Sequence, residues 1–238
     1  MTAIGKRTAN SVHLSFLMRF LTFFRFVAPL ACAALFTGGA SSETLGETPE
    51  NPFVNIKTVD PTIIVDLRYA SENNVTHRAL YPSQMPAFVR ASVAQRLVAA
   101  QKFLRTHGYG LKIWDAYRPQ AAQEKLWELT RKTTFVADPN DGIGSLHTRG
   151  VAVDATLVDI SGRAVEMPTD FDSFTPAAML VYQGNSSSVR FNLKMLQRAM
   201  GRVGFYGLRT EWWHFCAADW AKYSPVADMA LAPQKTSL

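Results

Sequence analysis

The stretch SLHTRGVAVDATL, residues 145–157, places a histidine and an aspartate at the two ends of a short apolar run. Val151 and Val153 alternate with small residues, which is typical of a buried strand. Gly150 permits a tight bend or a close backbone approach just before the run. If the strand starts at Val151, Asp154 lies one strand length from the loop that carries His147, and one metal ion could bridge the two side chains.

A catalytic zinc site takes three protein ligands and leaves one position for water, so this pair needs a third ligand. The segment EWWH at residues 211–214 offers His214. In a strand, Glu211 and His214 face opposite ways. Glu211 therefore approaches the same metal only if the strand bends or if Glu211 lies at the end of the strand. There it could move a proton from water to a leaving amine. The alternative for Glu211 is an exposed acid at a strand edge.

Most of the net charge of +6 comes from the first forty residues. Four basic residues and no acid precede residue 41, and 21 basic against 19 acidic residues remain without them. That balance argues against a nucleic-acid surface, so no nucleic-acid partner is expected. A length of 238 residues suits one well-packed domain.

Residues 1–40 resemble a secretory signal peptide. A basic segment precedes the apolar run FVAPLACAALF at 26–36, and Gly38 and Ala40 suit cleavage before Ser41. The run is short for a membrane span. We therefore expect an exported, periplasmic protein with no stable membrane partner after cleavage. The alternative is a retained membrane anchor that begins near Leu14.

After cleavage, Cys216 is the one cysteine left, so the domain has no intramolecular disulfide. Cys216 follows the apolar Phe215 and is interpreted as a small buried hydrophobe rather than a metal ligand or nucleophile.

The remaining pattern predicts a single α+β domain with a central, mainly antiparallel sheet flanked by helices. We expect a loose leader at 41–58, the catalytic domain at 59–225 and a flexible tail at 226–238. Within the domain the pattern predicts strands at 62–69, 111–117, 151–157 and 211–216, helices at 91–107, 119–132 and 192–202, a hairpin turn at 159–163 and irregular chain at 166–188. The inner helix faces would carry Val93, Leu97, Ala100 and Leu104, then Ala122, Leu126 and Leu129.

Four motifs in one order resemble a known family. They are DLRYA at 66–70 followed by Asn74, DAYRP at 115–119, SxHxxGxAxD at 145–154 and ExWH at 211–214. Together they resemble the zinc-dependent D-alanyl-D-alanine dipeptidases of the VanX type, over about residues 55–225. The resemblance implies the small α+β fold shared with D,D-carboxypeptidases and the hedgehog signalling domain.

The resemblance also implies roles for individual residues. One zinc ion would be bound by His147, Asp154 and His214. Glu211 would be the catalytic base and acid, and Arg118 would stabilise the oxyanion, which suits a fixed guanidinium near a reacting carbonyl.

Tyr69, Ser145 and Asp172 match positions that hold the substrate, a small dipeptide. Asp170 competes with Asp172, because the surrounding loop aligns only by spacing. The alternatives are a D,D-carboxypeptidase or endopeptidase that trims peptidoglycan stems, and a non-catalytic module that binds wall peptides. Glu211 and Arg118 argue against the last. The sequence leaves open the physiological dipeptide, a role in antibiotic resistance or wall recycling, and the oligomeric state.

Overall fold

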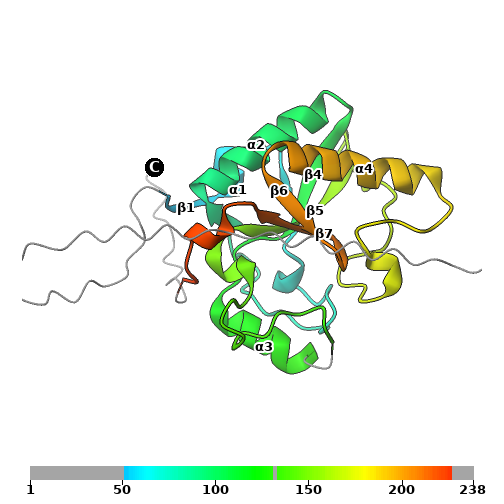
Figure 1. The fold of residues 1–238 in the computed structure, drawn as a ribbon. Coiled ribbons are helices and arrows are strands. Elements are labelled where there is room, and N and C mark those ends of the chain that lie inside the picture. Colours follow the sequence, from blue (N-terminus) through cyan, green and yellow to red (C-terminus); the bar gives the residue numbers. More distant parts are fainter. Residues whose placement is uncertain (1–50, 131–132, 227–238) are drawn as a thin grey trace, which may run out of the picture. The chain divides into compact units, whose positions relative to one another are not determined.

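A five-stranded sheet forms the centre of the described residues, which are 51–130 and 133–226 of the computed structural model (Figure 1). Its strand order is β2-β4-β5-β7-β6, with β2 at Ile64–Val65, β4 at Tyr109–Asp115, β5 at Ala152–Asp159, β6 at Phe205–Leu208 and β7 at Glu211–Ala217. Only β2 and β4 pair in parallel. The other three pairs are antiparallel. This architecture confirms the expected α+β fold with a mainly antiparallel sheet.

Strand β5 lies in the middle of the sheet, between β4 and β7. Every residue from Ala152 to Val158 is buried, so both faces of this strand are covered. Its small and β-branched side chains suit such a position, because they pack closely on both sides of a sheet. The apolar run found in the sequence is therefore the central strand, and Asp154 is a buried carboxylate within it.

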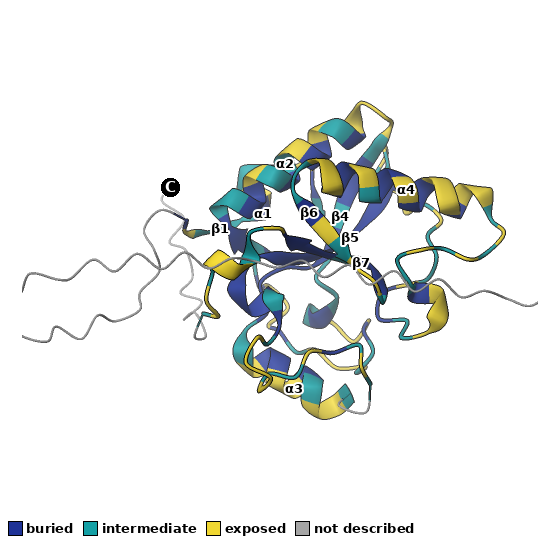
Figure 2. Cartoon of the chain, viewed as in Figure 1, coloured by how far each residue is buried: buried dark blue, intermediate teal, exposed yellow. Residues whose placement is uncertain are grey.

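Two helices, α2 (Ala91–Arg105) and α4 (Ser187–Arg202), lie on one side of the sheet, and α3 (Gln120–Thr130) lies on the other (Figure 1). Both long helices turn buried residues inward and exposed residues outward (Figure 2). In α2 the predicted inner face is confirmed, since Val93, Leu97, Ala100 and Leu104 are all buried. In α3 the prediction is wrong for Leu129, which is 40% exposed.

The predicted loose leader is wrong from residue 51 onward. Strand β1 (Phe53–Asn55) pairs with β3 (Phe88–Arg90), and the short helix α1 (Ile56–Val59) follows β1. The Asn55 side chain caps α1 by accepting from the Lys57 amide at 3.0 Å, and Ile56 is buried in the core. Phe53 and Val54 also pack against the core, which the mostly polar composition of 41–58 did not indicate. The predicted signal peptide at 1–40, residues 41–50 and the tail beyond residue 226 lie outside the described residues.

Most predicted elements match to within about two residues at each end, but two differ more. The strand predicted at 62–69 is limited to β2, because a 3₁₀ turn at Arg68–Ala70 follows it. Helix α4 begins at Ser187 rather than 192, since the Ser186 hydroxyl caps it by accepting from the Val189 amide at 3.3 Å. Strands β1, β3 and β6 were not predicted. Further 3₁₀ turns occur at Leu146–Arg149, Pro176–Ala178 and Trp220–Lys222. Within 51–130 and 133–226, no helix has the length and apolar character needed to span a bilayer.

Candidate active site

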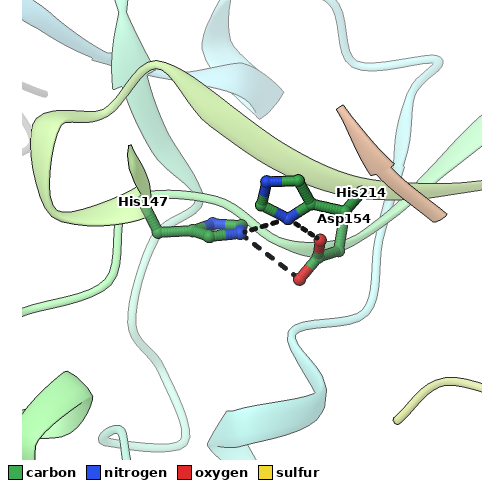
Figure 3. Close-up of side chains that lie close together, drawn as sticks. All are labelled: His147, Asp154 and His214. Carbon is green, nitrogen blue, oxygen red and sulfur yellow. Dashed lines mark hydrogen bonds and ion pairs between the residues drawn. The ribbon is translucent and has the colours of Figure 1, made fainter. Parts of the chain in front are cut away.

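Three predicted metal ligands converge on one point at the centre of the sheet (Figure 3). The Nε2 atom of His147 lies 3.2 Å from Nδ1 of His214 and 3.5 Å from Oδ2 of Asp154. The Nδ1 atom of His214 lies 3.0 Å from Oδ1 of Asp154. One nitrogen or oxygen atom from each side chain thus faces a common point, and the three groups could hold a metal ion.

Sheet register brings two of these ligands together. Asp154 on β5 is the register partner of His214 on β7 and, on its other side, of Asp115 on β4. A register shift in β4 between Ile113 and Asp115 aligns Asp115 with Asp154. Three polar side chains therefore form one row across three neighbouring strands. In a cross-strand row, opposite residues lie within about 4.5–5.5 Å at their Cβ atoms, close enough for a shared ion.

The third ligand, His147, comes from the 3₁₀ turn Leu146–Arg149 just before β5. Ser145 caps this turn, because its hydroxyl accepts from the His147 amide at 3.3 Å. Gly150 ends it with a φ of 69°, and a Cβ at Gly150 would overlap the ring of Phe53. Only glycine satisfies both conditions, so the local sequence fixes where His147 leaves the backbone.

Each histidine has a partner on its second ring nitrogen. Nδ1 of His147 donates to the carbonyl oxygen of Ala116 at 2.8 Å and lies 3.4 Å from Asp115. A carbonyl can only accept, so this bond leaves Nε2 of His147 free to face the cluster. Nε2 of His214 lies 3.0 Å from Sγ of Cys216. Cys216 is buried, as predicted, but it also contacts a candidate ligand.

The charge state of the cluster favours a cation. Burial by itself would raise the pKa of Asp154, but His147 and His214 hold it well below its usual range. Burial would lower the pKa of His214, yet Cys216 and Asp154 raise it well above the usual value. The carboxylate therefore stays ionised and attracts a proton to its histidine neighbour. A metal ion would replace that proton, as is usual when metals bind histidine.

Glu211 shares a pocket of about 460 Å³ with the cluster. It reaches the pocket because β7 departs from regular pairing: Gly207 on β6 faces Phe215, whereas the next residue, Leu208, faces Glu211. Glu211 is also the first residue of β7, so it lies at the end of the strand, as one of the two alternatives from the sequence required. Burial raises the pKa of Glu211 to about 8. The alternative of an exposed edge acid is wrong, since Glu211 is 7% exposed.

Arg118 lines the same pocket and is held rigidly. Its Nη2 and Nε donate to Oδ2 of Asp115 at 2.6 and 3.1 Å, and its Nη1 donates to Gln123 at 2.7 Å. The guanidinium carbon lies 4.9 Å from the centre of the Tyr69 ring, and Nη2 lies 3.9 Å from Asp154. Burial opposes the charge, but Asp115 raises the pKa of Arg118 well above its usual value. A fixed positive charge therefore borders the metal cluster.

The three predicted substrate-binding residues also line this pocket. Tyr69 donates from its hydroxyl to Oδ1 of Asp172 at 3.1 Å. Burial raises the pKa of Asp172 to about 7, and Asp172 has a φ of 56°. The competing residue, Asp170, has a side chain that is 71% exposed and pairs with Arg68, and it does not line the pocket. The geometry thus favours Asp172 over Asp170.

The whole described domain matches a known family. The family described as D-ala-D-ala dipeptidase matches residues 49–232. The chain belongs to this family. The match extends from before β1 to beyond the last described residue, which agrees with a domain that starts earlier than residue 59.

Named relatives agree with the family assignment. A D-alanyl-D-alanine dipeptidase of Escherichia coli is 31% identical over 74% of this chain and 89% of its own length. A D-alanyl-D-alanine dipeptidase of Enterococcus faecium is 27% identical over 65% of this chain and 85% of its own length. A solved structure, VanYB in complex with D-Alanine-D-Alanine, is 17% identical over 67% of this chain and 87% of that chain, with a TM-score of 0.36. The family assignment rests on the family match and on the Escherichia coli relative, and it makes this chain a peptidase, as the sequence indicated.

Some residues around the site of this D-Ala-D-Ala dipeptidase family member were assigned no role from the sequence. Asp115 is fully buried and accepts from the Tyr81 hydroxyl at 2.8 Å as well as from Arg118. Gln123 is also fully buried and joins Arg118 to the Ala137 carbonyl at 2.7 Å. Asp115 belongs to the DAYRP motif at 115–119, so the motif contained a signal for it. Nothing local distinguished Tyr81 or Gln123.

Proposed function

We propose that this chain is a zinc-dependent dipeptidase that hydrolyses D-Ala-D-Ala. The observation that carries the proposal is one pocket in which a His-Asp-His cluster, a buried glutamate and a fixed arginine meet. These are the groups that metal-assisted amide hydrolysis requires: metal ligands, a proton carrier and a positive charge for the developing oxyanion. Membership of the D-Ala-D-Ala dipeptidase family supports the choice of substrate.

The geometry of the cluster supports zinc. Bonds of about 2.0–2.2 Å arranged tetrahedrally put ligand atoms roughly 3.3–3.6 Å apart. The facing nitrogens of His147 and His214 lie 3.2 Å apart, and each lies 3.0–3.5 Å from one of the two oxygens of Asp154, so small shifts would complete the arrangement. Two imidazoles and one carboxylate are a common zinc ligand set that leaves a position for water or substrate. When bound, zinc would polarise the scissile carbonyl and make water more acidic.

Glu211 is the proposed proton carrier. Its carboxylate takes a proton from the attacking water and then gives it to the leaving amine, so one residue acts as base and then as acid. A pKa raised by burial suits this exchange, because a carboxyl group that titrates near neutral pH can both accept and release the proton. In a fully regular strand Glu211 and His214 would face opposite sides of the sheet.

Arg118 is the proposed partner of the negative charge that develops on the carbonyl oxygen. Asp115 and Gln123 fix its guanidinium before substrate arrives, so little reorganisation is needed during the reaction. A lysine would lack the planar fork that allows several bonds at once.

Tyr69 and Asp172 are proposed to bind the free ammonium group of the dipeptide. A buried carboxylate beside a hydroxyl can form charge-assisted hydrogen bonds to an ammonium group. In a longer or acetylated substrate, a neutral amide replaces the ammonium and leaves Asp172 without a charged partner. Sites that lose such a partner discriminate by ~10⁴-fold or more. Ser145 borders the same pocket and is proposed as a further substrate contact.

We also propose that the protein acts outside the cytoplasm, in the cell envelope. The basic and apolar segments of residues 1–40 support export, and D-Ala-D-Ala is a component of peptidoglycan stems.

The proposal is tested by measuring D-alanine release from D-Ala-D-Ala, N-acetyl-D-Ala-D-Ala and a stem pentapeptide in parallel. Rapid release from the dipeptide alone is expected. Equal cleavage of the acetylated substrate would instead indicate a D,D-carboxypeptidase. The metal assignment is tested in the same preparation, which should contain about one zinc per chain. His147→Ala and His214→Ala should lose zinc and activity together, and stoichiometric zinc in both variants would overturn the ligand set.

A further inference from the structure

A second cavity shares Asp172 with the central pocket but contains none of the metal ligands. It has a volume of about 320 Å³, and its lining consists of Glu72, Asn73, Asn74, Val75, His77, Phe171 and Asp172. Asp172 lines both this cavity and the central pocket. Asp172 therefore borders both spaces, and the segment 71–78, which we call the Asn74 loop, borders the second cavity.

The Asn74 loop contacts the carboxylate of Asp172 directly. The Val75 amide donates to Oδ2 at 3.2 Å, while the Tyr69 hydroxyl donates to Oδ1 at 3.1 Å. Each oxygen of Asp172 is thus held from a different segment. Because both donors are fixed, the carboxylate has little freedom to rotate.

Asn74 is the side chain that holds the loop in shape. Asn74 is 7% exposed, and its Nδ2 lies 2.7 Å from the Ser71 carbonyl, 2.9 Å from Arg78 and 3.3 Å from Arg68. Its Oδ1 accepts from both the amide and the hydroxyl of Thr76, at 2.9 and 2.7 Å. One amide group therefore links the beginning, the middle and the end of the loop.

The loop is also tied to Tyr69. The Tyr69 carbonyl accepts from the amides of Leu80 and Tyr81 at 2.7 and 3.0 Å, just after the loop ends. His77 within the loop has a φ of 51°, a conformation that non-glycine residues adopt only when their surroundings hold them there. The shape of the loop thus depends on its internal hydrogen bonds.

We propose that Asn74 determines substrate length by holding this loop as a barrier behind Asp172. The inference rests on the dipeptidase function proposed above. If Asp172 binds the ammonium group of the dipeptide, any residue added before that group must extend past Asp172, toward the loop and the second cavity. With Asn74 in place, the Val75 backbone fills that path.

Loss of the Asn74 side chain has two consequences. The Val75 amide is no longer held against Asp172, so the ammonium site loses its alignment and the KM for the dipeptide rises. The barrier also loosens, so the neutral end of a longer substrate gains access to the second cavity. Asn74 is a positioning residue, because it touches neither the metal cluster nor the pocket.

The test compares Asn74→Ala with Asn73→Ala, an exposed neighbour that also borders the second cavity. Zinc content, kcat and KM are measured for D-Ala-D-Ala and for N-acetyl-D-Ala-D-Ala. Asn74→Ala should raise the dipeptide KM about tenfold or more, as expected for a lost buried hydrogen bond, with zinc content unchanged. The preference for the free dipeptide should fall by a similar factor, whereas Asn73→Ala should match the wild type.

A second variant, Asn74→Asp, guards against a misfolded alanine variant. It retains the acceptor for Thr76 but loses the donor to the three carbonyls, so it should shift KM and preference in the same direction. Wild-type KM and preference in a folded Asn74→Ala or Asn74→Asp protein would overturn the inference. Failure of the wild type to cut D-Ala-D-Ala would instead overturn the proposed function, so the two failures are distinct.

Discussion

Replacement of Asp115 by asparagine should destabilise the protein strongly, although Asp115 touches neither solvent nor substrate. Its carboxylate accepts four hydrogen bonds, from the Tyr81 hydroxyl, the Ala116 amide and two nitrogens of Arg118. Nδ1 of His147 lies 3.4 Å from it as well. In Asp115→Asn the side chain keeps its size but loses its charge. One of the two oxygens that accept hydrogen bonds in the wild type would be replaced by an NH₂ group, which would face other donors.

The expected loss of stability follows from the burial of the ion pair between Asp115 and Arg118. Arg118 and Asp115 have side chains that are 7% and 0% exposed. Removing one partner of a buried ion pair costs about 3–5 kcal/mol, because the other charge stays buried without compensation. For a domain of this size, 1 kcal/mol corresponds to about 2–4 °C, so the melting temperature should fall by roughly 6–20 °C.

Urea unfolding of metal-free protein at pH 7 measures the effect without added stability from bound zinc. The control is Lys125→Ala, which removes the exposed pair of Lys125 with Glu128 at 2.8 Å. Such pairs contribute at most about 1 kcal/mol. Asp115→Asn should also weaken zinc binding, because Arg118 would turn toward Asp154, 3.9 Å away. If Asp115→Asn unfolds within about 1 kcal/mol of the wild type, the argument from buried charge is refuted.

Three further predictions concern the site. Glu211→Gln should retain zinc but reduce kcat by ~10²–10⁴-fold, and a near-normal rate with full zinc content would assign proton transfer to another group. Cys216→Ala should lower zinc affinity by about 10–100-fold in a chelator competition, because His214 loses the partner of its second nitrogen, while Cys216→Ser should recover most of it. Metal-free protein should lose stability as pH rises from about 4 to about 7, because folded Asp172, with a pKa raised to about 7, keeps a proton that the unfolded chain releases near 3.8. Asp172→Asn should reduce that slope by up to about 1.4 kcal/mol per pH unit, as measured by urea unfolding across this range.

The sequence by itself determined the elements whose information is local. The alternation at Val151 and Val153 predicted the central strand, and the spacing of Val93, Leu97, Ala100 and Leu104 predicted the inner face of α2. Periodicity suffices there because each side chain takes its direction from its own backbone. Short motifs in a fixed order also predicted the metal ligands His147, Asp154 and His214 and the pocket residues Glu211 and Arg118, since residue type limits which chemistry a site can perform.

Only the tertiary structure decided how those residues meet. Asp154 lies between Asp115 and His214 because of register across three strands, and Glu211 reaches the pocket because of an irregularity between β6 and β7. Register and bulges depend on partners far along the chain, which no local pattern specifies. The same reason applies to the ordered segment at 53–59, which pairs with β3, and to Asn74. Its side chain bonds within its own loop, but the loop matters only because it packs against Asp172, 97 positions away from Val75.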